Sequence, residues 1–168
     1  MKYGSSSAAW PSLVLASVLA CAPAGLLGAC STEGGTDAHA AAETGRLQFG
    51  IVVEPGAPGA EEAVPYPRRA EQGGELLVAA PLLSVHLAKA FVTVDSMGYP
   101  AVGFEIAEAD VERFREFTSE FMGSRMAAIV DGTVVTAPVI ASPLPGQGVL
   151  SGRFSDAEVS AMLAALAP

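Results

Sequence analysis

The sequence predicts an α+β domain in which a mainly antiparallel sheet carries two helices on one face. Three observations lead to this fold class. An Asp-Gly pair at residues 131–132 stands between two β-branched runs, which is typical of a β-hairpin. Apolar residues recur at helical spacing over residues 108–122. A Ser-x-x-Glu pattern that begins at Ser155 opens a second helix near the end of the chain.

Length and charge limit what the protein can bind. The chain has 168 residues and a formal net charge of −9, which indicates one domain with a tail. Because 51% of the residues are hydrophobic and 16% are charged, the chain is not a disordered polyelectrolyte. The acidic balance argues against nucleic acid, since a phosphate backbone needs a basic surface. It also argues against attachment to anionic lipid by charge alone.

Residues 1–29 are predicted to be a lipoprotein signal peptide. Lys2 precedes an uncharged, apolar stretch over residues 8–28 that contains two prolines, which favours a secretory leader over a membrane span. The Leu-Gly-Ala-Cys segment that ends at Cys30 resembles the bacterial lipobox. This resemblance implies cleavage between Ala29 and Cys30 and attachment of lipid, with palmitate among its acyl chains, to the Cys30 sulfur. A plain signal peptide that contains a cysteine is the alternative.

Residues 30–45 are expected to be a flexible tether, because they are rich in Gly, Ala, Thr and acids and lack apolar periodicity. On this interpretation the domain is lipid-anchored on the periplasmic side of a bacterial cell envelope. Ser31 after the cysteine favours the outer membrane if the organism is a typical diderm, by analogy with lipoprotein sorting. An acylated Cys30 leaves no disulfide in the mature chain. No Cys/His cluster has metal-ligand spacing, so neither a metal nor a cofactor is expected.

The segment 46–75 is predicted to hold an N-terminal strand and a Pro-rich loop, before a compact domain over residues 76–168. Apolar residues alternate along residues 47–53 and predict the strand. Residues 55–74 carry four prolines, and we expect a loop of this length to be disordered. The apolar run 76–78 is too short to classify.

A hairpin and a helix are expected next. Residues 91–95 and 101–106 alternate on either side of a turn in which Gly98 can adopt a positive φ. The helix over residues 108–122 begins with two acids in its first turn, where the helix dipole favours negative charge. Its apolar side is predicted to consist of Val111, Phe114, Thr118, Phe121 and Met122, with Phe117 less well placed.

A second hairpin is predicted from residues 126–130 and 133–140, with Asp131 and Gly132 as a type I′ turn. Pro138 cannot donate to a strand ladder, so this end of the hairpin is expected at a sheet edge or bulge. Residues 149–154 predict a short strand. The last helix is expected to bury one stripe, consisting of Val159, Met162, Leu163 and Leu166.

The chain is not expected to be an enzyme. Ser84, His86 and Asp95 are the residue types of a hydrolytic triad, and the first two would share a face of a strand. However, no Gly-x-Ser-x-Gly elbow, phosphate-binding loop or identifiable oxyanion hole accompanies them. We therefore predict no catalytic residue and keep the triad as a minor alternative.

Residues 123–140 resemble the signature of the bacterial SecD preprotein-translocase subunit, roughly Gly-Lys-x-Leu-Ala-Ile-Val-Leu-Asp-Gly-x-Val-x-Ser-Ala-Pro-x-Ile. Residues 152–158 are similar to the block that follows it, and the resemblance covers about residues 75–166. It points to the head subdomain of the first periplasmic domain of SecD and implies a ferredoxin-like arrangement. The positions of this chain that match the signature turn and its continuation are Asp131, Gly132, Ala137 and Pro138.

The resemblance implies a module that binds extended polypeptide or a Sec translocase component and is linked to protein export. Thr136 and Ser151, on the two candidate edge strands, are the predicted peptide-binding positions. No intramembrane carboxylate for proton coupling is expected, so the chain is not a proton-driven translocase by itself. The alternative is an envelope binding module that has been repurposed and has no role in secretion.

Overall fold

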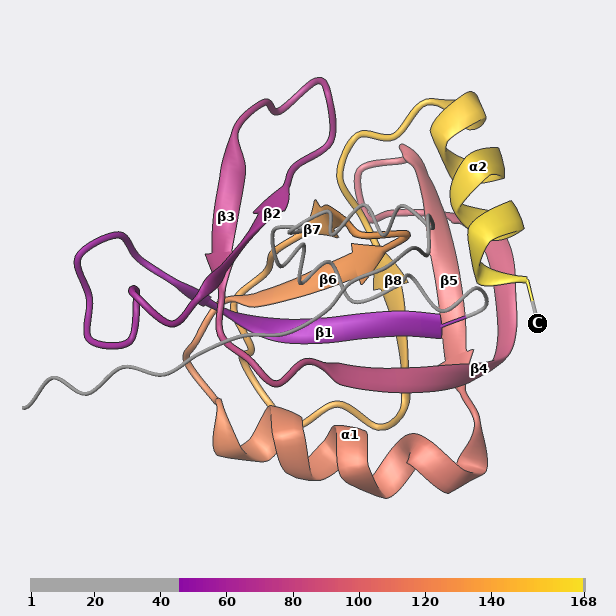
Figure 1. Ribbon diagram of the computed structural model, residues 1–168. Coiled ribbons are helices and arrows are strands. Elements are labelled where there is room, and N and C mark those ends of the chain that lie inside the picture. The colour runs from indigo at the N-terminus through magenta and orange to yellow at the C-terminus, as the bar shows by residue number, and fades with distance from the viewer. Residues whose placement is uncertain (1–45, 168) are drawn as a thin grey trace, which may run out of the picture. The chain divides into compact units, whose positions relative to one another are not determined.

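The computed structural model describes residues 46–167, which fold into an eight-stranded, mainly antiparallel sheet and two helices (Figure 1). The predicted α+β fold class is confirmed. In chain order the elements are β1 (Arg46–Val53), β2 (Val64–Pro67), β3 (Glu75–Val78), β4 (Leu83–Val94), β5 (Pro100–Ile106), α1 (Glu108–Glu120), β6 (Met126–Val130), β7 (Thr133–Thr136), β8 (Gln147–Leu150) and α2 (Asp156–Leu166).

The sheet is organised around β1, which pairs with β3 and β4 along one side and with β6 along the other. From β4 the sheet continues through β5 to β8, and from β6 it continues to β7. β4 pairs with β1 through its first residues and with β5 through the rest, with a register shift between Leu87 and Lys89. Such a bulge bends the strand, and β4 curves visibly in Figure 1.

Both helices bury their apolar sides in the same core cluster. From α1, Phe114 is fully buried and its ring lies 4.8 Å from that of Phe49 on β1. From α2, Val159, Met162 and Leu166 enter the same cluster. A smaller cluster around Val78 and Ile129 lies apart from it, and residues of β2 and β3 pack against it.

The local sequence signals are confirmed. Asp131 and Gly132 have φ values of 48° and 70°, as a type I′ turn requires. Ser155 caps α2 with a complete capping box: its Oγ accepts from the Glu158 amide, and the Glu158 carboxylate accepts from the Ser155 amide. Gly98 sits at φ 84° in the β4–β5 turn.

The expectation of a disordered loop over residues 55–74 is wrong, because β2 forms within it and pairs with β3. Pro65 and Pro67 alternate with Val64 and Tyr66. Arg68 lies on the same side of the strand alternation as Val64 and Tyr66, and its amide donates to the Gly74 carbonyl on the β3 side. The missing proline N–H groups therefore fall on the other side of the strand, where no ladder bond is lost.

Other boundaries also differ from the prediction. β4 begins at Leu83, eight residues before the predicted 91–95 strand. The last strand is β8, four residues before the predicted 149–154 segment ends, because its pairing with β5 places Leu150 opposite Val102. β7 ends at Thr136, before Pro138. Met122 lies beyond α1 and is 56% exposed instead of buried. The predicted signal peptide, the cleavage site at Ala29 and Cys30, and the tether lie outside the described residues.

Candidate functional site

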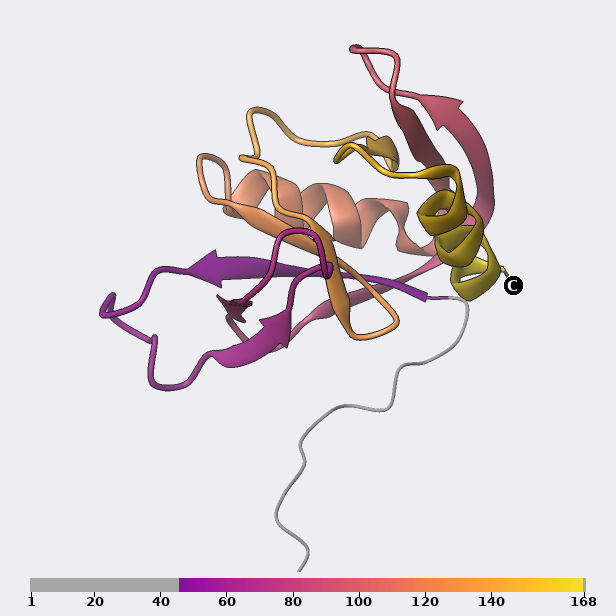
Figure 2. The same cartoon turned by 90° about the horizontal axis from the view of Figure 1, so that it is seen from above.

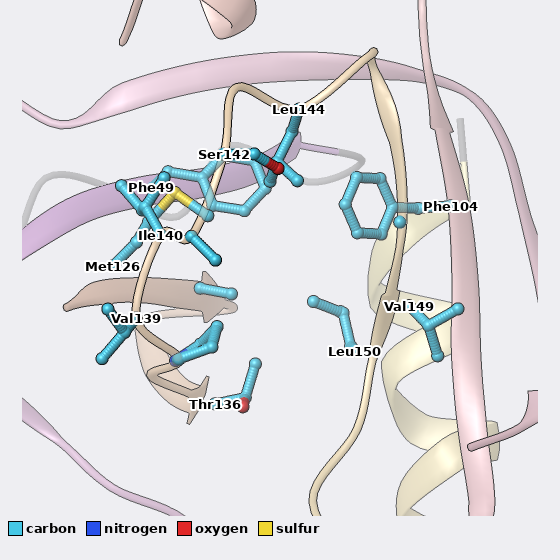
Figure 3. Close-up of a pocket in the computed structure, with 14 residues that line it drawn as sticks. Phe49, Phe104, Met126, Thr136, Val139, Ile140, Ser142, Leu144, Val149 and Leu150 are labelled. Carbon is cyan, nitrogen blue, oxygen red and sulfur yellow. The ribbon is translucent and has the colours of Figure 1, made fainter. Parts of the chain in front are cut away.

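An apolar groove of about 250 Å³ separates β8 from the segment that follows β7 (Figure 3). We call it the β7–β8 groove. Its lining residues are Phe49, Phe104, Met126, Ala128, Thr136, Pro138, Val139, Ile140, Ala141, Ser142, Leu144, Gly148, Val149 and Leu150. No charged residue is among them, so the groove suits an uncharged, apolar occupant.

Aromatic side chains from the core strands form the base of the groove. Phe49 on β1 and Phe104 on β5 lie with their ring centroids 6.1 Å apart. A β-carbon on Gly148 would lie only 2.8 Å from the Phe104 ring, so glycine lets β8 approach this ring closely. The base is therefore shaped by two buried rings and one missing side chain.

The two rims of the groove are exposed and apolar. Val139 is 58% exposed on one rim, and Val149 is 51% exposed on the other. Figure 3 shows these two side chains on opposite sides of the opening. Large aliphatic side chains at a rim are available to contact an incoming chain before it reaches the base.

One wall of the groove, β8, is an edge of the sheet. Within residues 46–167, β8 pairs only with β5. On the other wall, Met126 and Ser124 satisfy the backbone of Pro138 and Ile140 from the β6 side. The side of β8 that faces the groove thus presents backbone groups of the kind that recruit an added strand.

The predicted site residues fall in different places. Thr136 and Pro138 line the groove, whereas Ser151 lies just after β8, exposed and outside the lining. Ala137 packs against the smaller core cluster. The Asp131-Gly132 turn lies at the other end of β7. Only part of the predicted edge therefore belongs to the site, and the aromatic base was missed because its members come from distant strands.

The candidate triad of Ser84, His86 and Asp95 does not assemble. The Ser84 hydroxyl oxygen accepts a hydrogen bond from the Gln48 side-chain amide at 3.2 Å. The Asp95 carboxylate accepts from two backbone amides in the β4–β5 turn, at the far end of β4 from His86. His86 instead contacts the carboxylate of an acid in the first turn of α1, where the sequence predicts only a favourable interaction with the helix dipole.

That carboxylate is Asp110, which is 6% exposed. Its Oδ2 accepts from the His86 amide and lies 2.9 Å from His86 Nδ1, while Oδ1 accepts from Arg113 at 3.0 Å. The His86 amide, followed by its ring, lowers the pKa of Asp110 against the opposing effect of burial. The cluster ties the first turn of α1 to β4.

Arg69 makes a second tie that the sequence did not reveal. It is 8% exposed, and its Nη1 donates to the Glu158 carboxylate at 2.7 Å. Its guanidinium also lies over the Phe154 ring, 4.5 Å from the centroid. The Ser155 amide, followed by Arg69, lowers the pKa of Glu158. Arg69 thereby links the segment between β2 and β3 to the start of α2.

The sequence of the chain matches a known protein family. The family model for the SecDF P1 head subdomain matches residues 62–167. The chain belongs to this family. Its match to the P1 head begins two residues before β2, earlier than the sequence resemblance indicated, and extends past the end of α2.

Among curated relatives, the chain is 39% identical over 84 residues to the protein translocase subunit SecD of Aquifex aeolicus. The matched region covers 49% of this chain and 17% of that protein. It is 38% identical over 82 residues to SecDF of Thermus thermophilus, covering 48% of this chain and 11% of that protein. The chain therefore matches less than a fifth of the length of these relatives.

Two solved structures have a fold similar to that of this chain. One is described as a membrane component, SecDF, that enhances protein export; it has a TM-score of 0.56, is 26% identical, and the match covers 74% of this chain and 63% of that one. The other is SecDF in a super-membrane-facing form, with a TM-score of 0.55, 27% identity, and coverage of 73% and 18%. In residues 46–167 no helix has the length and apolarity to span a membrane.

Proposed function

We propose that this P1 head is a lipid-anchored, non-catalytic module of the bacterial envelope that binds extended polypeptide during protein export. The β7–β8 groove receives the polypeptide. Cys30 carries the lipid, and residues 30–45 connect it to the domain on the periplasmic side.

The groove is the observation that supports this proposal most directly. Its base and both rims are apolar, and one wall is a sheet edge. A polypeptide strand added to β8 would gain main-chain hydrogen bonds with little dependence on sequence, while one of its alternate side chains enters the groove. Binding without strict sequence preference suits a client that is any secreted chain in its unfolded state.

The relatives support the link to export. They are named protein translocase subunits, so a translocase component is a second class of partner for this module. Because the chain matches only a small part of those proteins, the alternative stays open that the same groove serves an envelope partner unrelated to secretion.

Photocrosslinking from the groove tests the function. A photoreactive amino acid at Thr136 should capture nascent secreted chains or translocase subunits in cells. The matched control is the same amino acid at Ser119, exposed on α1 and outside the groove lining. Equal capture from both positions, or none from either, would refute groove binding. Capture at Thr136 of one envelope protein that is not part of export would establish the alternative.

The anchor has a separate test. Cells fed a labelled fatty acid should label the wild-type chain, and Cys30→Ala should remove the label because the acceptor thiol is gone. Cys21→Ala is the matched control and should leave labelling intact. Label retained by the Cys30→Ala chain would show that the anchor is wrong without affecting the groove.

A further inference from the structure

The turn of the β4–β5 hairpin exposes large apolar side chains. Val92 is 65% exposed, Val94 is 63% exposed, Met97 is 72% exposed and Tyr99 is 37% exposed. We call these four residues the hairpin tip. Figure 2 shows the hairpin projecting beyond the rest of the domain at this end. An apolar projection of this kind cannot enclose a ligand. Its exposed side chains are suited to insertion into another apolar environment.

Hydrogen bonds also hold the turn of the tip together. Asp95 Oδ1 accepts from the Met97 amide at 2.8 Å and from the Tyr99 amide at 3.0 Å, and the Asp95 amide donates to the Tyr99 carbonyl. The amides of Asp95, Met97, Gly98 and Tyr99 are therefore satisfied within the turn. Satisfied amides lower the penalty when a backbone turn leaves water.

Two cations lie behind the tip, while the turn itself holds one carboxylate, that of Asp95. Arg153 lies over the Tyr99 ring at 5.5 Å, and Lys89 lies over the Phe91 ring at 4.9 Å. By contrast, the exposed face of α1 carries acids at every fourth position, consisting of Glu108, Glu112, Glu116 and Glu120. α1 lies away from the turn in Figures 1 and 2. Aromatic and cationic groups behind an apolar end are typical of a membrane interface.

We infer that the hairpin tip inserts into the interface of the lipid bilayer to which the chain is anchored. The tether length agrees with this. β4 runs about 26 Å from His86 to Val94 at the usual rise of a strand. Arg46, where the tether meets the domain, is hydrogen-bonded to His86. A chain of the length of residues 30–45 can span about 55 Å at full extension, which is longer than the distance from His86 to Val94 and allows the tip to reach the bilayer.

The inference rests on the proposed anchor for this reach but not on the groove. Its consequence is an orientation: the tip faces the lipid and the acidic face of α1 faces away, where it is not repelled by an anionic membrane surface. Insertion is driven by apolar burial, so neutral lipid is sufficient.

Tryptophan fluorescence tests the inference. The only tryptophan of the chain, Trp10, lies in the predicted signal peptide, so Met97→Trp gives the mature chain a single fluorophore, at the tip. When the lipidated Met97→Trp chain is bound to phosphatidylcholine vesicles, its emission should shift to shorter wavelength and be quenched by brominated acyl chains. Adding Val94→Asp to this variant should abolish both effects. The matched control, Ser119→Trp on α1, should show neither.

Four outcomes would overturn the inference. On vesicle-bound protein, the indole of the Met97→Trp variant could be as open to aqueous iodide as the indole of the Ser119→Trp variant. The shift in tryptophan emission could require anionic lipid, which would mean that charge attraction and not apolar burial brings the tip to the membrane. It could occur without vesicles at high protein concentration, which would assign the tip to contact between two copies of the chain. Absence of any vesicle-bound protein would refute the anchor as well, whereas the first outcome refutes the tip alone.

Discussion

The ring of Phe104 lies where a side chain on Gly148 would have to go: a β-carbon at that glycine would sit 2.8 Å from the ring. Phe104 forms part of the base of the β7–β8 groove, and Gly148 lies on the β8 wall. The size of the groove therefore depends on an absent side chain.

Gly148→Ala is expected to weaken polypeptide binding, because the Phe104 ring must move away from the added methyl group or β8 must shift outward. Binding of an apolar, extended peptide, measured by fluorescence anisotropy, should fall by about tenfold, which corresponds to about 1.4 kcal/mol. Gly98→Ala is the control. It strains a turn with φ 84° and should lower stability without changing peptide affinity. Equal losses of affinity in both variants would contradict this role of Gly148.

Phe114→Ala should lower the free energy of unfolding by about 3–5 kcal/mol, because the ring is fully buried against Phe49 and its removal leaves a cavity. Urea denaturation followed by circular dichroism measures the change. Phe117→Ala, which removes a partly buried ring on the same helix, should cost clearly less. An unchanged midpoint for Phe114→Ala would refute the assignment of α1 to the core.

Asp110→Asn should lower the free energy of unfolding by about 1–2 kcal/mol at pH 7, because the ionised carboxylate accepts from His86 and Arg113. The pKa of Asp110 is lowered in the folded state, so the unfolded state takes up the proton first as the pH falls. The contribution is therefore complete above about pH 4, the ordinary range for aspartate, and disappears as the pH falls through the lower folded value.

Urea midpoints at several pH values, for wild type and Asp110→Asn, check this dependence. The difference between the two proteins should be constant near neutrality and close in acid. Glu62→Gln, in an exposed loop, should follow the wild type throughout. A difference that grows on acidification would have the wrong sign for a carboxylate with a lowered pKa.

Arg69→Met and Glu158→Gln should each destabilise the domain, and their effects should be coupled. Glutamine still completes the capping box at the start of α2, so Glu158→Gln tests the ion pair and not the cap. The double-mutant cycle from chemical denaturation should give a coupling energy of about 1–3 kcal/mol. Additive effects would mean that the 2.7 Å contact contributes no net stability.

Elements with a short-range cause were predictable from the sequence. The Asp131-Gly132 turn and the Ser155 to Glu158 capping box each depend on residues at most three positions apart, and both formed as predicted. The family signature likewise lies in one continuous segment, and the family model matches it.

Features that depend on long-range pairing were not predictable in the same way. β2 forms although two of its four residues are prolines. It pairs with β3 along one side, and the missing proline N–H groups fall on the other side. Asp110 meets His86 across 24 residues and Arg69 meets Glu158 across 89. The groove draws its lining from β1, β5, β6 and β8, so no local pattern contains it.

β4 is shared by the two halves of the sheet, since its first residues pair with β1 and its later residues pair with β5. The two walls of the β7–β8 groove belong to opposite halves: β7 is reached from β1 through β6, and β8 is reached through β5. The irregular step between Leu87 and Lys89 therefore lies on the path of paired strands that joins the two walls. A change in the bend of β4 at this step would change the separation of the two walls.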